Sequence, residues 1–417
     1  MVRVCDAIMG TGKSSAAIRY MNEHSNEKFI YVTPYLTETE RIRKDCAKLH
    51  FVEPSDKLRE YHFKKSVHTM ALIEEGCNIS TTHQAFKGYT QQTLDHIREQ
   101  GYTLIIDENV EILETFEYHP TDLQVAIDAG YIEENNGVYS LAKDGYDGEA
   151  LKEMMYLLKS RELIRVSERD KDPLFFWALP PDLLTSFKDV FVLTYLFQGQ
   201  SIKYFMDIYN IHYEYIGIER TEDGGYRFGE FPGYTPEYVH CLKDRLQILD
   251  NPRMNEIGDG FYALSKSWYG RNGDGVAQLK KNIGNYYNNI WRDVPADRKM
   301  WGSYKGEMNK VKGKGYTKAF VTFNIKATNQ YKNRDCLVYV ANLFMNVNEK
   351  KFYHLHGIEV DENMYALSIM VQWIWRSAIR DGGTVNLYIP SKRMRTLLIN
   401  WIENINKGGN QVEPQKM

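Results

Sequence analysis

The sequence has little that would build a disulfide or cysteine–metal scaffold. Its 417 residues contain only five cysteines, and none forms a CxxC pair or lies near a pair of metal-spaced histidines: Cys5, Cys46, Cys77, Cys241 and Cys336. Secreted disulfide frameworks and zinc modules show such spacings. We therefore expect a reduced, intracellular protein.

Long hydrophobic runs and an excess of basic charge are also lacking. The longest apolar stretches, such as residues 191–197, are far shorter than the ~20 residues of a membrane-spanning helix. Arg3 and Asp6 interrupt the only early apolar segment, which argues against a signal peptide. The formal net charge of −3 gives no overall basic footprint for nucleic acid, although a local groove can still be basic. No membrane partner is expected.

The composition is that of a globular protein with a large core. Hydrophobic residues make up 43% and charged residues 26% of the chain, and the length favours two or three domains. Short β-rich runs alternate with helical patterns near the N-terminus: strands at 2–7, 29–33, 78–81 and 103–107, helices at 14–23 and 37–49. This alternation predicts βαβ units and a parallel sheet that is covered on both faces.

The rest of the chain is divided by a change of pattern. Residues 117–189 are irregular and are interpreted as an insertion on the first lobe, which a buried strand at 191–196 closes. The α/β pattern then restarts, with strands expected at 260–264, 318–323 and 385–389 and a long helix at 362–380. The sequence thus predicts an α/β fold with one lobe at 1–200, a second at 201–410 and a disordered tail at 411–417.

A glycine-rich loop at residues 7–14 is the sharpest motif. Its sequence, AIMGTGKS, matches GxxxxGK[ST] except that Ala7 replaces the first glycine, and a strand precedes it while a helix follows. The glycines let backbone N–H groups point at phosphate oxygens, and the helix N-terminus adds partial positive charge. The pattern predicts an ATP phosphate site formed by Gly10, Thr11, Gly12, Lys13, Ser14 and Ser15. The alternative is a strand–helix turn without a ligand.

Two carboxylates follow the apolar strand at 103–107. Asp107, together with Ser14, is expected to bind Mg²⁺, and Glu108 is expected to orient and deprotonate an attacking water. Taken alone, such a pair is as typical of a surface turn. It gains weight because it follows a phosphate-binding loop in the same predicted sheet.

The order of these motifs resembles the DEAD/DEAH-like superfamily 2 helicases, especially the compact helicases of phages. Besides residues 7–14, the segments 31–35 (YVTPY), 79–84 (ISTTHQ), 107–110 (DENV) and 192–196 (VLTYL) are similar to successive motifs of that family. The resemblance follows most of the chain by order but only short segments by sequence. It implies two tandem RecA-like lobes and a coupling role for Thr194.

The second lobe carries a pattern similar to the sixth helicase motif, Gln-x-x-Gly-Arg-x-x-Arg. Gln372, Arg376 and Arg380 fit it, although Trp375 replaces the glycine and the last arginine is one residue late. The resemblance implies a catalytic set of Lys13, Glu108, Gln372, Arg376 and Arg380. On the expected helix at 362–380 the two arginines share a face, and either can be the arginine finger. The alternative is a helix with two exposed cations.

Contacts to a nucleic-acid strand follow partly from the resemblance and partly from composition. The resemblance implies backbone contacts by Thr33, Pro34, Thr82, His83, Thr328 and Asn329. A lysine- and glycine-rich segment around Lys312 and Lys314, with Trp301, Tyr304 and Tyr316 nearby, suits a single strand. A solvated lysine-rich loop is an equally good interpretation of that segment.

Together these features predict an ATP-dependent helicase or translocase that hydrolyses Mg²⁺-ATP between its lobes and moves on DNA or RNA. Single-stranded or forked DNA is the expected partner rather than RNA, and phage replication or recombination in a bacterial cytoplasm is the expected setting. A monomer suffices because both halves of the ATP site lie in one chain. The alternatives are another nucleic-acid motor, such as a packaging ATPase, or an ATP-gated binder that does not unwind.

Overall fold

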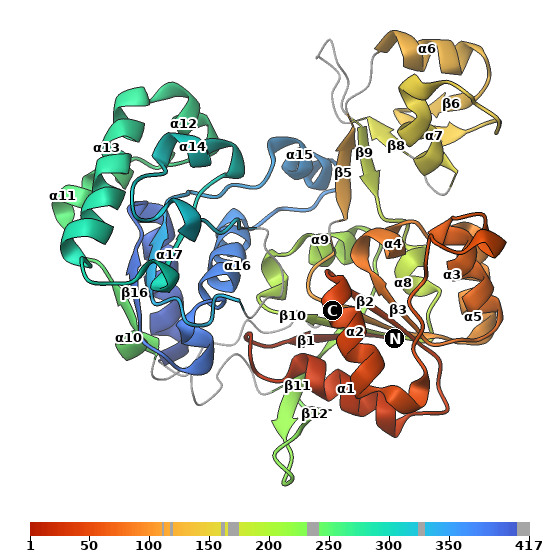
Figure 1. The fold of residues 1–417 in the computed structure, drawn as a ribbon. Helices are drawn as coiled ribbons and strands as arrows, with labels where there is room; N and C mark the ends of the chain where they lie inside the picture. The colour runs from red at the N-terminus through yellow and green to blue at the C-terminus, as the bar shows by residue number, and fades with distance from the viewer. Residues whose placement is uncertain are drawn as a thin grey trace. The chain divides into compact units, whose positions relative to one another are not determined.

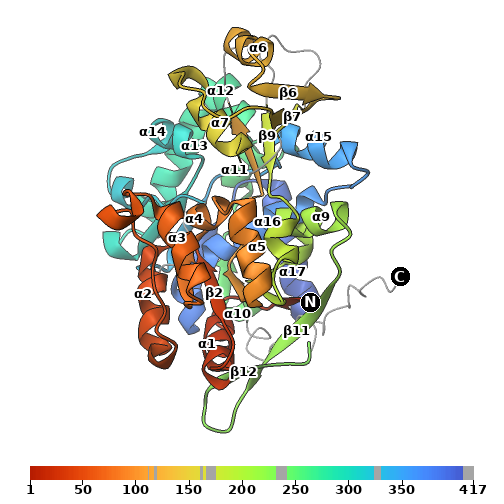
Figure 2. The same cartoon turned by 90° about the vertical axis from the view of Figure 1, so that its right-hand side faces the viewer.

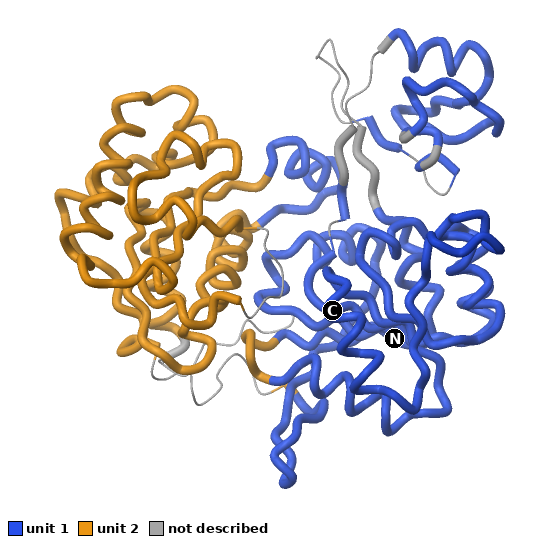
Figure 3. Tube along the Cα trace, viewed as in Figure 1, with its two compact units in different colours: residues 1–6, 12–230, 346–360 blue, residues 7–11, 231–345, 361–417 orange. Residues whose placement is uncertain are grey.

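The computed structural model describes residues 1–110, 112–116, 120–159, 163–165, 175–231, 242–323 and 330–406. The chain divides into two compact units, coloured separately in Figure 3. Unit 1 comprises residues 1–6, 12–230 and 346–360, and unit 2 comprises residues 7–11, 231–345 and 361–417. Each unit contains its own parallel sheet, so the predicted α/β class with two parallel-sheet lobes is confirmed.

Unit 1 is built on a seven-stranded sheet (Figures 1 and 2). The strand order is β12-β11-β1-β10-β4-β2-β3, and every neighbouring pair is parallel except β11 with β12. Strands β2 and β4 are buried along their whole length, as expected for strands with helices on both faces. The strands are β1 (Val2–Asp6), β2 (Phe29–Thr33), β3 (Ile79–Thr82), β4 (Thr103–Asp107), β10 (Asp189–Thr194), β11 (Tyr213–Arg220) and β12 (Tyr226–Gly229). The helices are α1 (Lys13–Glu23), α2 (Leu36–Asp45), α3 (Lys65–Glu74), α4 (His83–Lys87), α5 (Gln91–Gln100), α8 (Asp182–Thr185), α9 (Ser201–Ile208) and α15 (Val347–Leu355).

The insertion between β4 and β10 has a sheet of its own, which the sequence did not predict. Its five antiparallel strands follow the order β5-β9-β8-β7-β6. Each strand has only three or four residues, too few to show a clear alternation of apolar and polar positions. Asn136 and Gly137, both with positive φ, form the tight turn that joins β6 to β7. The elements are β5 (Leu113–Phe116), α6 (Pro120–Asp128), β6 (Ile132–Asn135), β7 (Val138–Leu141), α7 (Lys152–Leu158), β8 (Leu163–Arg165) and β9 (Phe175–Ala178).

Unit 2 contains a four-stranded parallel sheet in the order β13-β16-β15-β14. Its core is rich in aromatic side chains, among them the fully buried Trp301 and Trp373. Tyr287 and Tyr388 each donate a hydroxyl hydrogen bond of 2.7 Å to a backbone carbonyl, which satisfies their polar ends inside the core. The elements are α10 (Leu242–Arg245), β13 (Leu246–Ile248), α11 (Pro252–Asn255), α12 (Lys266–Arg271), α13 (Gly273–Asn285), β14 (Lys299–Gly302), α14 (Met308–Val311), β15 (Cys336–Tyr339), α16 (Glu362–Ile374), β16 (Val385–Tyr388) and α17 (Lys392–Asn406).

Two strands expected in this unit are wrong. Residues 260–264 form turns, and residues 318–323 contain a 3-10 turn (Thr317–Ala319) and a single bridge from Phe320 to Trp301. Leu264 and Ala319 are nevertheless buried. Buried apolar side chains in a loop produce the same sequence pattern as a buried strand, which explains the wrong prediction.

The long helix expected at 362–380 is also wrong in its second half. Helix α16 ends at Ile374, and the backbone of Ser377 is extended. The N–H of Ala378 then donates to the carbonyl of Arg334 at 2.8 Å instead of continuing the helical ladder. Arg380 lies in the following 3-10 turn (Ala378–Asp381), so Arg376 and Arg380 do not share a helix face.

None of the helices in the described part of the chain combines the length and the apolar character needed to cross a membrane.

Candidate functional site

The polar residues expected in the first lobe meet at the carboxyl edge of the unit 1 sheet. Strand pairing sets Asp6 opposite Thr194 and Asp107 opposite Leu193, while Thr33 pairs with Thr82 on the other side of β4. In open parallel α/β sheets, ligands bind at this edge.

The glycine-rich loop leaves this edge between β1 and α1. Gly10 and Gly12 have φ angles of 89° and 91°, a left-handed backbone that residues with a Cβ rarely adopt. The hydroxyl of Thr11 donates to the carbonyl of Ile8 at 2.7 Å and closes the turn. Helix α1, of 11 residues, then begins at Lys13, so its free N–H groups lie at the end of the loop.

A tyrosine ring covers the loop at Gly12. An ideal Cβ built on Gly12 would lie 2.3 Å from Cγ of Tyr226, so no larger residue fits there. Tyr226 is on β12, which runs alongside α1 within unit 1 (Figures 1 and 2).

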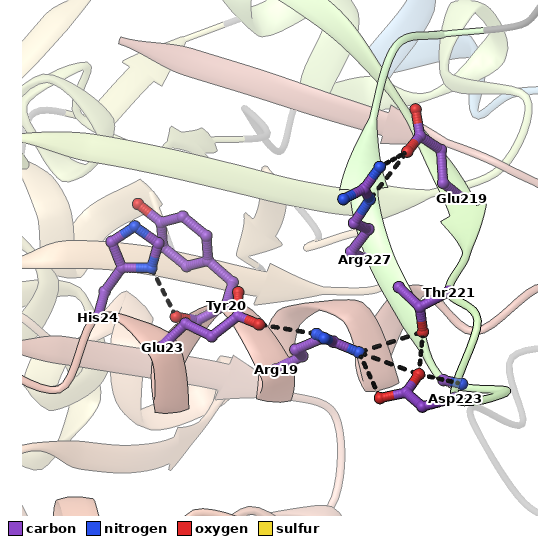
Figure 4. Close-up of polar contacts among 9 residues, drawn as sticks. Arg19, Tyr20, Glu23, His24, Glu219, Thr221, Asp223 and Arg227 are labelled. Carbon is purple, nitrogen blue, oxygen red and sulfur yellow. Dashed lines mark hydrogen bonds and ion pairs between the residues drawn. The ribbon is translucent and has the colours of Figure 1, made fainter.

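Figure 4 shows the hydrogen bonds and ion pairs that hold the β11–β12 hairpin against α1. The guanidinium of Arg19 donates to Thr221 at 3.1 Å and to Asp223 at 3.1 Å, and its Nε donates to Glu23 at 2.7 Å. The position of the Tyr226 ring over the loop is therefore set by a polar network on the helix that follows the loop.

Ser14, Asp107 and Tyr31 form a hydrogen-bonded set beside the loop. The hydroxyls of Ser14 and Tyr31 both donate to Oδ2 of Asp107, at 3.1 and 2.7 Å. Burial raises the pKa of Asp107, and these two hydrogen bonds act in the opposite direction. No role for Tyr31 is evident from the sequence alone. It pairs with Ile105, so it lies on the same sheet face as Asp107, and that register is not visible in the sequence.

Lys13 lies within electrostatic reach of several acidic groups. Burial lowers its pKa, while the Cys5 thiol and the carboxylates of Asp107, Asp6 and Glu108 act to raise it. A cation in this position is suited to bind a polyanion that enters the loop.

Glu108 has an unusual backbone. Its φ of 64° is left-handed, and its N–H donates to the carbonyl of Leu193 on β10 at 3.0 Å. For a residue with a Cβ this conformation is strained, and such strain is concentrated at functional sites. The side chain is half-buried, directly after Asp107.

Asp6 organises the turn after β10, a role that the sequence did not reveal. Its buried carboxylate accepts hydrogen bonds from the N–H groups of Leu196 and Phe197, at 2.8 and 3.0 Å. Thr194 donates to Gln200 at 2.6 Å in the same turn. The only available signal was an acidic residue at the end of an apolar strand, next to the glycine-rich loop.

Three of the residues expected to contact a nucleic-acid strand in unit 1 are buried or hydrogen-bonded within the protein. Thr33 is fully buried, and Thr82 caps helix α4 by accepting from the N–H of Ala85. The Nε2 of His83 lies 2.9 Å from the carbonyl oxygen of Asp107. Pro34 is half-buried. His83 thus ties α4 to the strand that carries the acidic pair.

The lysine-rich segment of unit 2 differs from its expected form. Lys314 is exposed and Lys312 is half-buried, but Trp301 and Tyr316 are buried. The indole N–H of Trp301 donates to the carbonyl of Tyr316 at 2.8 Å. The expectation that these two aromatic side chains face a nucleic-acid strand is wrong, because they belong to the core. The expected contacts Thr328 and Asn329 lie outside the described residues.

The residues of the sixth-motif pattern differ in exposure. Arg376 is buried at 7% exposure, Gln372 is half-buried and Arg380 is exposed. Residues 7–11 group with unit 2, and within that unit a Cβ built on Gly10 would lie 3.7 Å from Cγ of Arg380. Arg380 therefore lies beside Gly10.

Comparison with known proteins places the chain in a family. A model of the YonV C-terminal Rossmann-like domain matches residues 240–402. The chain is 37% identical over 415 residues to the SPbeta prophage-derived uncharacterized protein YonV of Bacillus subtilis (strain 168), covering 97% of this chain and 99% of that protein. The chain belongs to the YonV family. The matched domain contains the unit 2 sheet, and the glycine-rich loop and Asp107 precede it.

The chain also has similarity to solved structures at low sequence identity. An XPD helicase matches with a TM-score of 0.46 and 10% identity, over 99% of this chain and 96% of that chain. Xpd4 of S. tokodaii matches with a TM-score of 0.48 and 12% identity, over 98% and 94%.

Proposed function

We propose that this YonV-family protein is a nucleic-acid-dependent ATPase, an ATP-driven helicase or translocase of the superfamily 2 kind. The observation that carries the proposal is the set of Ser14, Tyr31 and Asp107 beside a glycine-rich loop whose lysine begins a helix. A hydroxyl and a buried carboxylate 3.1 Å apart are the few protein ligands that Mg²⁺ uses when phosphate oxygens and waters complete its shell.

The loop fits a triphosphate by the same reasoning. Its N–H groups and the α1 N-terminus supply donors and partial positive charge, and Lys13 supplies a full charge. The residues that hold phosphates in this proposal are Gly10, Thr11, Gly12, Lys13, Ser14 and Ser15. Among the described residues, no cluster of three or more His, Cys, Asp or Glu side chains could hold a metal alone, so phosphates would complete the Mg²⁺ site.

Hydrolysis requires an activated water and charge stabilisation. Glu108 is the proposed base, because its backbone is fixed by Leu193 directly beyond the metal ligand Asp107. Gln372, Arg376 and Arg380 are the candidates in unit 2 for stabilising the transition state. The exposure of Arg380 and its proximity to Gly10 favour it as the arginine finger, whereas Arg376 is buried.

The same contacts can couple ATP hydrolysis to binding of a nucleic-acid strand. His83 contacts the carbonyl of Asp107, so a shift of the acidic strand end reaches α4 and Thr82. On the opposite side, Glu108 contacts the strand that leads to Thr194 and Gln200. We place the nucleic-acid contacts at the half-buried Pro34 and Thr82, supported from within by the buried Thr33 and His83, and at Lys312, Lys314, Thr328 and Asn329 in the second lobe.

The proposed partner is single-stranded or forked DNA rather than RNA. The prophage origin of the YonV relative supports a phage replication or recombination setting within a bacterial cell. A monomer suffices for catalysis, because one chain supplies every residue of the proposed site.

Unwinding of a forked DNA duplex tests this proposal. We expect Mg²⁺-ATP to drive strand separation by the wild-type chain, and Glu108→Gln to bind ATP and DNA but release no strand. ATP-dependent binding without separation would favour the ATP-gated binder, and identical behaviour with and without ATP would reject the proposal. Glu99→Gln, an exposed carboxylate on α5, is the matched control.

A further inference from the structure

A group of aromatic side chains lies at the carboxyl edge of the unit 2 sheet. Phe261 and Tyr262 come from the segment after β13, Phe344 follows β15, and Arg393 follows β16. The three strands are neighbours in the order β13-β16-β15, so their carboxyl ends meet. We call these four residues the aromatic platform.

The platform exposes large rings to solvent. Phe261 is 61% and Tyr262 66% exposed, and both contact Phe344, with ring centroids 5.8 and 5.5 Å apart. The ring planes of Tyr262 and Phe344 differ by 39°. Contiguous exposed aromatics are unfavourable in water and mark recognition sites on folded proteins.

The platform is also held rigidly. The side-chain amide of Asn342 donates to the carbonyls of Phe261 and Ala263, at 2.7 and 3.0 Å. Arg393 donates to Oδ1 of Asn342 at 2.9 Å, and its guanidinium lies 4.4 Å from the centroid of Phe344. A rigid aromatic surface loses little entropy when a ligand binds to it.

The charges around Arg393 indicate which ligand suits the platform. Burial lowers the pKa of Arg393, and the carboxylates of Glu362 and Asp361 act against that effect. The guanidinium already donates to Asn342 and to the backbone carbonyls of Leu343 and Glu362, which makes a phosphate a poor ligand here. A planar, uncharged group that stacks is a better match.

We propose that the aromatic platform stacks unpaired bases of the nucleic-acid strand. This inference rests on the proposed function, and it adds a base contact where the helicase motifs supply backbone contacts. Stacking on an aromatic side chain tolerates any base, because every base has a π-face.

Binding to strands with and without bases tests the proposal on the full chain. Fluorescence anisotropy would compare a single-stranded oligodeoxynucleotide with an abasic strand of equal length. We expect Tyr262→Ala to weaken binding of the ordinary strand about tenfold, within the range of base stacking on an aromatic side chain, and to leave the abasic strand unaffected. Tyr262→Phe should bind like the wild type, because the ring remains.

A second readout reports stacking directly. A 2-aminopurine base in the strand should lose fluorescence on binding to the wild type and retain more of it with Tyr262→Ala. Phe63→Ala removes an aromatic of 61% exposure from unit 1 and is the control that should change nothing. Thermal denaturation verifies that each variant is folded.

The outcomes separate this inference from the proposed function. A wild-type chain that binds no strand contradicts both. A wild-type chain that binds strands, with Tyr262→Ala equally tight or equally weakened on the abasic strand, overturns the platform alone. Binding of an apolar peptide with unchanged strand binding would assign the platform to a protein partner instead.

Discussion

Replacing Tyr31 by phenylalanine removes one hydrogen bond from the proposed metal ligand and leaves the core otherwise filled. The Tyr31 side chain is fully buried, and its hydroxyl donates to Oδ2 of Asp107 at 2.7 Å. A hydrogen bond to a charged group contributes about 1.5–3 kcal/mol, which corresponds to about 10- to 150-fold in an equilibrium constant. Ser14 still donates to the same oxygen, so the lower end applies.

We therefore expect Tyr31→Phe to raise the Mg²⁺ concentration that half-saturates ATP hydrolysis about tenfold, with little change in rate at saturating Mg²⁺. The assay is a Mg²⁺ titration of phosphate release at fixed ATP and strand concentration. Tyr102→Phe is the matched control, because Tyr102 is equally buried in unit 1 and donates to the carbonyl of Cys77, not to Asp107. Equal half-saturation for both variants would refute the positioning role of Tyr31.

The remaining predictions concern glycines and arginines. Gly12→Ala should weaken ATP binding at least about tenfold, because the backbone there is left-handed and the new Cβ would lie 2.3 Å from the Tyr226 ring. Adding Tyr226→Ala should restore part of this loss, as measured by titration with a fluorescent nucleotide. Arg380→Ala should slow hydrolysis about 10³-fold with ATP binding retained, because Arg380 is the exposed candidate for the arginine finger. Arg376 is buried, so Arg376→Ala should mainly lower the melting temperature. The reverse pattern in ATPase and melting assays would make Arg376 the arginine finger. Gly258→Ala should lower the free energy of unfolding by about 1–3 kcal/mol, because the new Cβ would lie 2.0 Å from a backbone carbonyl oxygen. Urea denaturation measures this change, and unchanged stability would contradict the packing at Gly258.

The sequence predicted five of the seven strands of the unit 1 sheet because their signals are local, but it assigned residues 213–229, which form β11 and β12, to the second lobe. Strands β2 and β4 have the bounds expected from five-residue apolar runs, and the runs are clear because both sheet faces are buried. The loop from Gly10 to Ser14 was equally visible, since its glycines, lysine and hydroxyl are consecutive in the chain.

Features that depend on tertiary contacts were not visible. Strands β13, β14 and β15 have three or four residues each, so no period emerges, and Leu264 suggested a strand because a loop is buried there. The end of α16 depends on a hydrogen bond from Ala378 to Arg334, which is distant in sequence. Helical periodicity alone continues past that point.

The partners of the candidate site were missed for the same reason. Tyr31 reaches Asp107 through the register of two strands, and Asp6 reaches Leu196 across 190 residues of chain. Motif matching identifies residues that touch a ligand in many proteins. It does not identify the side chains that hold those residues in place in this one.

Strand-stimulated phosphate release tests the central claim most directly. The full chain with Mg²⁺-ATP would be measured with and without single-stranded DNA and RNA, beside Lys13→Ala and the control Lys44→Ala, an exposed lysine of α2. The account predicts hydrolysis that a strand accelerates, that Lys13→Ala abolishes and that Lys44→Ala leaves intact. Hydrolysis that ignores every strand, or that survives loss of Lys13, would contradict it.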